Sequence, residues 1–365
     1  MSEISGSPAF DRKETFLARY PRKTKLVVTG CLTVLLLAFF FTSGKKTAFV
    51  RPPTPVNTAE SSSPELTRPA APSSFPLSAD PYKPGPSDPN AIAANDKDDR
   101  AARMAHAPDY FLTEDTSEGG LPKVSLDGRK PWQVYARPFN TSDKRPRLAL
   151  VITDMGLSAA FSDAALRRLP ANVTMVFDTQ SPVLGAWLGR ARQDGHETLL
   201  AVPMEPFDYP RSDPGPNTLL TNLPNSDNLR RLYWSLRRGT GYIGVTTLSG
   251  SRFTTTPSKI TPILEELKDR GLMVFDARVA PHSVLKDLAR QLQLPVAMST
   301  LQIDQTLSPD AIDAALNQLE QTARHTGHAV GVAAALPVTL ERLEPWVKQL
   351  SSRGIALAPL SAMVE

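Results

Sequence analysis

The chain has 365 residues, 34 prolines and a single cysteine, Cys31, so a disulfide framework and a cysteine-ligated zinc site are excluded. Its net charge of +4 is unevenly distributed: nine Lys and Arg against three Asp and Glu give +6 in residues 1–51, which leaves −2 for residues 52–365. The larger part therefore lacks the basic excess of nucleic-acid-binding proteins, and we expect no nucleic-acid partner.

Residues 26–43 form a long uncharged apolar run, "LVVTGCLTVLLLAFFFTS". Its length of about 18 residues is near the minimum for a membrane-spanning helix, and more basic residues precede it than follow it. A cleaved signal peptide would have a shorter apolar core and an Ala-x-Ala-like site, and neither is clear here. We predict a retained single-pass transmembrane anchor, with residues 1–25 as a basic cytoplasmic tail and everything after residue 50 exported.

Residues 44–119 are rich in Pro, Ser, Ala, Asp and Asn. Such a composition offers too little apolar area to offset the entropy lost when the backbone is ordered, so we predict a disordered linker. Residues 120–146 follow as a collar segment, which contains an Asp-Gly turn and aromatic side chains that need a packing surface.

From residue 147 to residue 365 the sequence alternates apolar runs with helical stretches. The runs lie at 148–153, 173–177, 198–204, 242–248, 272–275, 295–303, 329–336 and 355–360. Because they are apolar throughout instead of alternating, they indicate strands covered on both faces, as in a parallel sheet with helical crossovers. The pattern predicts an α/β fold, a (β/α) barrel of seven or eight mostly parallel strands, with a doubly wound open sheet as the alternative.

In a parallel barrel the functional site lies where the strands end, so the residues that follow each run are the candidates. They are Asp154, Asp178, Glu205, the turn 246–252, Asp276 with Arg278, and Asp304. Each alone could cap a helix or a loop, but several acids at one rim favour general acid-base work or cation binding. We select Asp154, Glu205 and Asp276 as candidate catalytic residues.

Four histidines follow residue 119, and none of them clearly joins these acids. His196 precedes a strand, and His325 and His328 lie at a helix end, so all three belong to the opposite rim. His282 can reach the strand ends, but a surface or helix-start role is the more common use of such a residue. The sequence predicts no metal site, and Asp154 is the candidate ligand if a metal were bound.

Five blocks after residue 147 are typical of one family: "LALVITDMGLS", "GHETLLAVPMEPFDYPRSDPGPNTLLT", "NLRRLYWSLRRGTGYIGVTTLSGSRFT", "LEELKDRGLMVFDAR" and "LAPLSAMV". Together they resemble the divergent polysaccharide deacetylase family of bacterial envelopes, and "DGRKPWQVYARPF" resembles the segment that precedes the domain in some members. The resemblance implies a distorted (β/α) barrel and carbohydrate as the substrate class. With the predicted anchor, it implies a bacterial inner-membrane protein whose barrel is periplasmic.

The resemblance also implies a metal centre that this chain does not complete. Polysaccharide deacetylases resemble one another in an Asp and two His that hold a metal, beside a second Asp that acts as base on a metal-bound water. Here Thr153 replaces one carboxylate and Asp154 remains. The positions where members show histidines hold Ala201, Leu248, Ala334 and Leu336. A lone carboxylate loses most metal affinity, because zinc sites use three or four protein ligands.

Polar side chains near the strand ends remain able to bind a ligand, and we assign substrate binding to Asp208, Tyr209, Arg211, Ser251, Arg252 and Arg278. We therefore expect a membrane-anchored pseudoenzyme, without a cofactor, that binds an envelope glycan such as peptidoglycan or an envelope protein. The alternative is an active metal-dependent deacylase that holds zinc or another cation at Asp154, Glu205 and Asp276. A purely structural role of the rim acids is the third interpretation.

Overall fold

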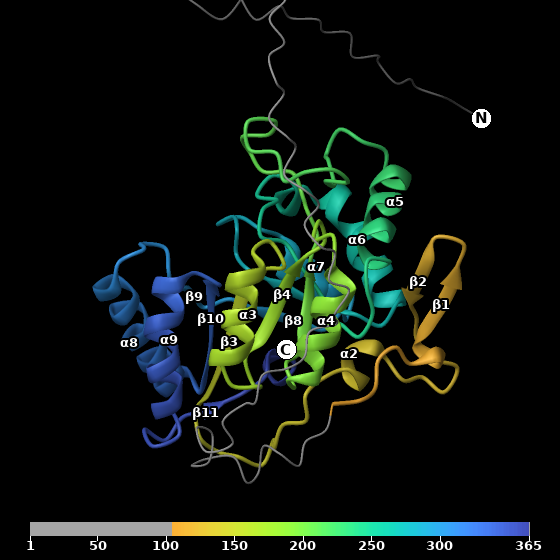
Figure 1. Ribbon diagram of the computed structural model, residues 1–365. Coiled ribbons are helices and arrows are strands. Elements are labelled where there is room, and N and C mark those ends of the chain that lie inside the picture. Colours follow the sequence, from red (N-terminus) through yellow and green to blue (C-terminus); the bar gives the residue numbers. More distant parts are fainter. Residues whose placement is uncertain (1–103, 365) are drawn as a thin grey trace, which may run out of the picture. The chain divides into compact units, whose positions relative to one another are not determined.

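The computed structural model describes residues 104–364, and Figure 1 shows the arrangement of their helices and strands. The predicted cytoplasmic tail, the predicted anchor and most of the predicted linker lie outside these residues. Among the helices of residues 104–364, none combines the length and the apolar character that crossing a membrane requires.

A parallel sheet of nine strands forms the centre of the described structure. Its strands are β3 (Arg147–Met155), β4 (Thr174–Asp178), β5 (Thr198–Ala201), β6 (Gly244–Thr246), β7 (Met273–Asp276), β8 (Val296–Met298), β9 (Leu301–Gln302), β10 (His328–Ala334) and β11 (Ala356–Leu357). Their order in space is β8-β7-β6-β5-β4-β3-β10-β9, and β11 pairs with β3 off this path. Each of the predicted apolar runs contains a strand, so the predicted α/β class with parallel strands is confirmed.

The two ends of the sheet are joined by one continuous stretch of chain. β8 pairs with β7 and β9 pairs with β10, yet only Ser299 and Thr300 separate β8 from β9. The Ser299 amide donates to the Asp276 carbonyl at 2.9 Å on one side, and the Thr300 amide donates to the Val330 carbonyl at 2.8 Å on the other. The sheet is therefore curled, which supports the predicted barrel over the open sheet. The run predicted as one strand over 295–303 is divided into two at this seam.

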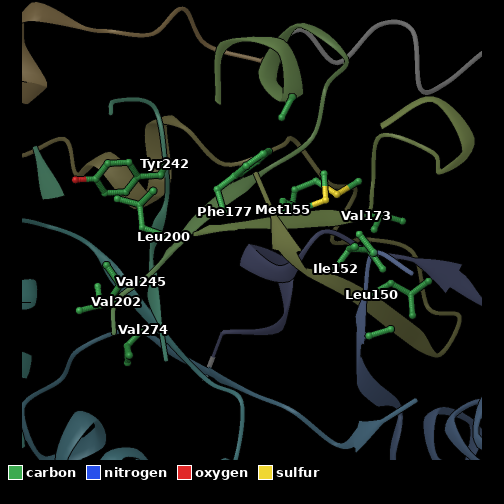
Figure 2. Close-up of a cluster of buried hydrophobic side chains, with 14 of the residues drawn as sticks. Leu150, Ile152, Met155, Val173, Phe177, Leu200, Val202, Tyr242, Val245 and Val274 are labelled. Atoms are coloured by element: carbon green, nitrogen blue, oxygen red, sulfur yellow. The ribbon is translucent and has the colours of Figure 1, made fainter. Parts of the chain in front are cut away.

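Helices connect the strands and cover the outer face of the sheet (Figure 1). They are α3 (Ala159–Arg168), α4 (Leu184–Gln193), α5 (Asn225–Leu236), α6 (Pro257–Asp269), α7 (Leu285–Gln291), α8 (Pro309–Thr326) and α9 (Pro337–Gln349). Outward-facing strand residues pack with them in a large apolar cluster. Figure 2 shows part of this cluster, with Leu150 and Ile152 from β3 and Phe177 from β4. Burial of these side chains supplies the main force that holds helices to sheet.

The inner face of the strands forms a second apolar cluster. Ala149 and Val151 belong to it, and they alternate along β3 with the helix-facing Leu148 and Leu150, as the pleat of a strand requires. The short helix η5 (Leu360–Met363) adds fully buried Leu360 to this cluster. The filled interior is a packed core, so no ligand can be bound inside the barrel.

A buried carboxylate joins three segments at the strand-start end of the barrel. Glu197, directly before β5, accepts hydrogen bonds from the Arg137 amide at 2.8 Å and from the amide of Ser361 at 3.1 Å. Thr174 at the start of β4 donates its hydroxyl to the same carboxylate at 3.3 Å. Burial raises the pKa of Glu197. The collar, the sheet and the last helix are thereby fixed together.

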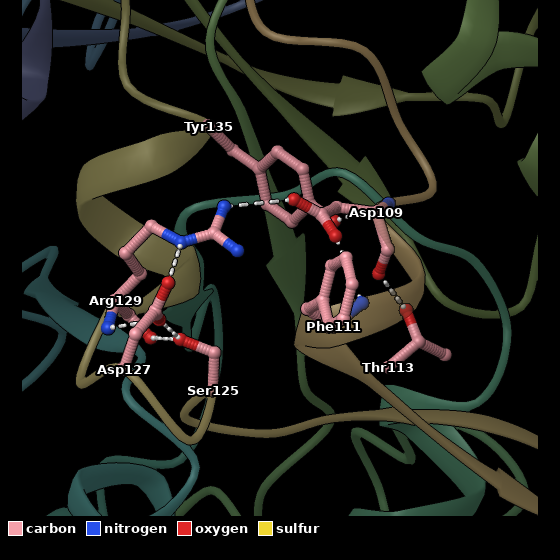
Figure 3. Close-up of polar contacts among 7 residues, drawn as sticks. All are labelled: Asp109, Phe111, Thr113, Ser125, Asp127, Arg129 and Tyr135. Carbon is pink, nitrogen blue, oxygen red and sulfur yellow. Dashed lines mark hydrogen bonds and ion pairs between the residues drawn. The ribbon is translucent and has the colours of Figure 1, made fainter.

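The collar begins earlier than composition suggested. The helix η3 (Tyr110–Leu112) leads into a hairpin of β1 (Thr113–Thr116) and β2 (Gly119–Pro122), and α2 (Pro131–Val134) follows. Residues 110–119, assigned above to the linker, form ordered structure because Leu112 and Leu121 are buried against the domain. Figure 3 shows polar contacts of this region, in which Arg129 pairs with Asp109 at 3.1 Å and the Asp109 amide donates to the Tyr135 hydroxyl at 3.0 Å.

Candidate functional site at the strand ends

The strand ends form a rim at one end of the barrel, and the register shows which residues lie at the same height. Thr153 pairs with Ala334, Asp178 with Ala201, Ala201 with Thr246, and Thr246 with Phe275. The three candidate catalytic acids all lie at this end: Asp154 near the end of β3, Glu205 shortly after β5 and Asp276 as the last residue of β7. Their strands are not neighbours, because β4 and β6 lie between them.

Asp154 is exposed and has a φ of 62°, in the left-handed region that is unusual for a residue other than glycine. The pairing of β3 with β4 shifts register between Ile152 and Met155, so the strand is irregular at this residue. Although Asp154 is exposed by area, its surroundings desolvate the carboxyl, and the charges of Asp178 and Asp304 act in the same direction. The pKa of Asp154 is therefore raised.

Asp154, Asp178 and Asp304 form an acidic group that depends on the order of the strands. Asp178 ends β4, which neighbours β3, and it accepts a hydrogen bond from the Gln180 amide at 2.7 Å. Desolvation raises the pKa of Asp178 as well. Asp304 is buried after β9 and accepts hydrogen bonds from the Ala334 amide at 2.7 Å and from Thr339. The sequence named all three as strand-end acids, but only the placement of β10 between β9 and β3 unites them.

Glu205 is 5% exposed and its carboxylate is fully engaged. Its Oε2 accepts hydrogen bonds from both the amide and the hydroxyl of Thr221, and its Oε1 faces Arg252 Nη1 at 3.4 Å. Its own amide donates to the Leu219 carbonyl at 2.9 Å. These bonds tie both ends of the loop 206–221 together, so the geometry favours loop support over contact with a ligand.

Asp276 is similarly engaged within its own loop. It is buried, and it accepts hydrogen bonds from the Arg278 amide at 2.8 Å and from the Ser283 hydroxyl at 3.3 Å. Burial raises its pKa, and these two donors oppose the rise. Arg278 itself has a φ of 57°, which the hydrogen bond to Asp276 helps to hold. The carboxylate thus shapes the segment between β7 and α7.

The residues assigned to substrate binding lie on the loops that follow β5, β6 and β7, three neighbouring strands. Arg211, Arg252 and Arg278 are exposed there, as is Asp208, whereas Tyr209 and Ser251 are half-buried. Ser251 joins two of these loops by accepting a hydrogen bond from the Phe207 amide at 3.0 Å. This part of the rim therefore presents three guanidinium groups on connected loops.

Phe207 is a rim residue that the sequence reasoning missed. Its ring is exposed, and its carbonyl accepts a hydrogen bond from Arg252 Nη2 at 3.2 Å. The signal was an aromatic residue directly after Pro206 on a strand-exit loop, where nothing requires an apolar side chain for folding. An exposed aromatic ring next to charged donors is a common feature of ligand-binding surfaces.

The residues at the strand ends do not fit the zinc centre that the family resemblance implies. Ala201 ends β5 and is buried, Ala334 ends β10, and Leu248 packs against the inner apolar cluster. Thr153 donates its hydroxyl to the Ala333 carbonyl at 3.3 Å. None of these side chains offers an imidazole, thiolate or carboxylate. Within residues 104–364, no three His, Cys, Asp or Glu side chains are grouped so that they could hold a metal ion.

The histidines lie where the sequence placed them. His196 is buried at the strand-start end, its Nδ1 lies 2.7 Å from the Val173 carbonyl, and burial lowers its pKa to about 4. His325 and His328 are exposed at the end of α8 and the start of β10, opposite the rim. His282 is exposed on the loop between β7 and α7. None completes a ligand set at the strand ends.

Comparison with known proteins gives consistent matches. A family model described as "Divergent polysaccharide deacetylase" matches residues 150–364. The crystal structure of an uncharacterized protein from Agrobacterium tumefaciens is 35% identical with a TM-score of 0.66, over 67% of this chain and 100% of that one. The uncharacterized Escherichia coli protein YibQ is 22% identical over 205 residues, 56% of this chain and 63% of YibQ. An uncharacterized Haemophilus influenzae protein is 22% identical over 223 residues, 60% of this chain and 79% of that protein.

Proposed function

Since the chain belongs to the divergent polysaccharide deacetylase family, as its sequence blocks predicted, we propose that it binds an envelope glycan at the strand-end rim without hydrolysing it. One observation carries this proposal: the positions where the family resemblance implies metal ligands hold Thr153, Ala201 and Ala334, while a polar, arginine-bearing surface remains on the neighbouring loops. Loss of a metal-activated water removes most of the rate of such a hydrolysis, but it does not remove binding.

The glycan contacts in this proposal come from the loops after β5, β6 and β7. The exposed ring of Phe207 offers a flat apolar face for a sugar ring, and Arg211, Arg252 and Arg278 offer donors for hydroxyl and carboxylate oxygens. Peptidoglycan suits this surface because it combines sugar rings with carboxylates. Asp208 and Tyr209 belong to the same loop and add polar contacts.

The proposal includes the predicted anchor at residues 26–43, with a cytoplasmic N-terminus and the barrel in the periplasm. This placement would bring the barrel within range of peptidoglycan while the chain stays in the inner membrane. It is tested by fusing a periplasm-only reporter after residue 365 and by extracting membranes with carbonate. Release of the chain by carbonate would contradict a retained anchor.

The binding function is tested with the full-length chain in non-ionic detergent. Sedimentation with purified peptidoglycan is compared for wild type, Arg211→Gln/Arg278→Gln and the control Arg230→Gln, an exposed arginine on α5. We expect the double variant to bind about fivefold more weakly, because two charge-assisted contacts are lost, and the control to bind like wild type. Equal binding by all three proteins would contradict the assigned surface.

A second candidate is an active deacylase that works at the acidic group. Its support is the raised pKa of Asp154, which lies beside Asp178 and Asp304, because a carboxyl that is protonated more readily than usual can act as a general acid. Acetate release from chito-oligosaccharides and peptidoglycan fragments is measured with zinc, cobalt, manganese or calcium added. We expect the wild-type chain to release no more acetate than Asp154→Asn does. Metal-dependent release that Asp154→Asn abolishes would overturn the proposal of binding without hydrolysis.

A further inference from the structure

The described part of the chain exposes eight large apolar side chains, and they fall into two groups. Three lie in the collar: Tyr110, Phe111 and Leu126. Five lie on or next to strand-exit loops: Leu157, Phe161, Val183, Phe207 and Leu307. Single exposed apolar residues need no explanation, but several at one end of a barrel indicate a surface that is covered by something.

Four of the rim side chains lie over one sector of the barrel. Leu157 and Phe161 follow β3, Val183 follows β4, and Leu307 follows β9. In the sheet, β9, β10, β3 and β4 are consecutive neighbours, so these loops are adjacent in space. Leu157, Val183 and Leu307 are 60%, 56% and 58% exposed, which leaves most of each side chain in water. We call Leu157, Phe161, Val183 and Leu307 the apolar sector.

The loops that carry the apolar sector contain acids and no basic residue. Residues 153–163, 178–184 and 303–311 include five aspartates and neither lysine nor arginine. Asp154 and Asp310 are exposed, and Asp178 is half-buried. Three cations reach these loops from elsewhere. Arg167 and Arg190 pair with Asp163, the second at 2.7 Å, and Arg238 donates to the carbonyls of Thr179 and Ser181, at 3.1 and 2.8 Å. Five aspartates against three arginines still leave the sector an excess of negative charge.

The rim is thus divided into two sectors of different character. The loops after β5, β6 and β7 present Arg211, Arg252 and Arg278, whereas the apolar sector is acidic. Three of the four side chains in the apolar sector are aliphatic, and aliphatic side chains do not stack on sugar rings as aromatic rings do. The aspartates repel the carboxylates of peptidoglycan and the phosphates of anionic lipids. The charge and the apolar area of this sector together complement a basic, amphipathic polypeptide.

We propose that the apolar sector docks a basic amphipathic helix of a partner protein, with apolar side chains of the helix on Leu157, Phe161, Val183 and Leu307 and its Lys or Arg near Asp154. This inference rests on the proposed function, because it needs a rim that binds instead of hydrolysing. The barrel then holds a glycan on one sector and a protein on the other. Such an arrangement brings the partner protein to the glycan.

The test uses the full-length chain in non-ionic detergent and a defined probe. The probe is a fluorescent peptide of about 18 residues with Leu and Lys at helical spacing, which gives one apolar and one basic face. A second peptide has Glu in place of Lys, and a third has the composition of the first in scrambled order. Binding is measured by fluorescence anisotropy, with empty micelles as the blank. Circular dichroism checks the fold of each variant.

The decisive variant is Val183→Ser/Leu307→Ser, and its matched control is Leu126→Ser, an exposed leucine of the collar. We expect the double variant to weaken binding of the basic amphipathic peptide about tenfold, as removal of central apolar contacts does. Asp154→Asn should weaken the binding of this peptide about threefold. Added salt should lower the affinity of this variant for the peptide less than it lowers that of wild type. Leu126→Ser should bind the basic amphipathic peptide like wild type. The Glu peptide and the scrambled peptide should not bind.

The glycan and peptide assays separate this inference from the proposed function. Arg211→Gln/Arg278→Gln should weaken the binding of peptidoglycan and leave that of the peptide unchanged. Val183→Ser/Leu307→Ser should weaken the binding of the peptide and leave that of peptidoglycan unchanged. Equal binding of the Lys and Glu peptides, or full binding by Val183→Ser/Leu307→Ser, overturns the docking surface and leaves glycan binding untouched. The docking surface is also overturned if the wild-type chain sediments as a dimer and Val183→Ser/Leu307→Ser sediments as a monomer. In that case a second copy of the chain covers the apolar sector.

Discussion

Glu205 accepts two hydrogen bonds from Thr221, one from its amide and one from its hydroxyl, across a loop of sixteen positions. A carboxylate at the end of an apolar strand is a natural candidate for catalysis, and the sequence nominated it. In the folded chain the same side chain also faces Arg252 at 3.4 Å, so both carboxylate oxygens are in contact with donors of the protein. Its role in the geometry is to hold the longest rim loop in one conformation.

Substitution of Glu205 should therefore affect stability before it affects binding. Glu205→Ala leaves the amide and hydroxyl of Thr221 and the guanidinium of Arg252 without their acceptor, and we expect it to lower the free energy of unfolding by about 2–4 kcal/mol. Glu205→Gln keeps one acceptor oxygen and should cost less. Urea unfolding measures the difference, with Asp208→Ala on the exposed part of the loop as control. A stability of Glu205→Ala equal to wild type would contradict this role.

Asp276 should make the protein less stable as the pH rises. Burial raises its pKa above the ordinary 3.8, so between 3.8 and the folded value the folded chain binds more protons than the unfolded chain. The free energy of unfolding therefore decreases with increasing pH through that window. Asp276→Asn removes this charge and keeps an acceptor for the Arg278 amide. We expect the variant to show a shallower decrease in urea titrations from pH 4 to pH 7, and a steeper one would contradict the assignment.

His196 should make the protein less stable as the pH falls. Its pKa is lowered from 6.5 to about 4, because charging the buried ring is costly, so the unfolded chain binds the extra proton first. The stabilisation is complete above pH 6.5 and decreases as the pH falls to about 4, by about 3 kcal/mol in all. His196→Asn keeps a donor for the Val173 carbonyl but does not titrate. Its stability should change less over this range than that of wild type or of the exposed-site control His325→Asn.

Leu360 should be essential to the barrel although it lies far from the rim. It is fully buried in the inner cluster, and its amide donates to the Thr174 hydroxyl at 3.1 Å. Leu360→Ala leaves a cavity in the packed interior, and we expect a loss of about 2–4 kcal/mol in the free energy of unfolding. Leu126→Ala, at a fully exposed leucine, is the control and should change stability little. Peptidoglycan binding at temperatures where Leu360→Ala is folded should be unchanged.

The fold could be predicted from the sequence because its signals are local. Each apolar run contains a strand, and the unbroken apolar character of these runs follows from burial on both faces, which only a parallel sheet with helices demands. The one division that the pattern concealed is at Ser299 and Thr300, because both residues lie inside a run that is mainly apolar. Hydrogen bonds to two different neighbours, not composition, separate β8 from β9.

The site could be predicted only in part, because its parts meet through the order of strands. The sequence identified the strand-end acids, but it gave no sign that β10 lies between β9 and β3 and so brings Asp304 toward Asp154. The sequence also could not show that Thr221 donates hydrogen bonds to Glu205 and that Ser283 donates one to Asp276. No sequence motif marks either donor, and the pairs are formed only when the loops fold.

The seam between β8 and β9 gives the barrel a line along which it can open. Thr300 is held to Val330 from both directions, since its amide donates to the Val330 carbonyl and its hydroxyl accepts the Val330 amide at 3.0 Å. If these two bonds and the pairing of β9 with β10 at Leu301 and Gln302 break, the ring becomes an open strip while the strand pairs from β10 to β8 persist. Amide protons at the seam should therefore exchange with solvent faster than those of β3, through a local excursion that needs no global unfolding.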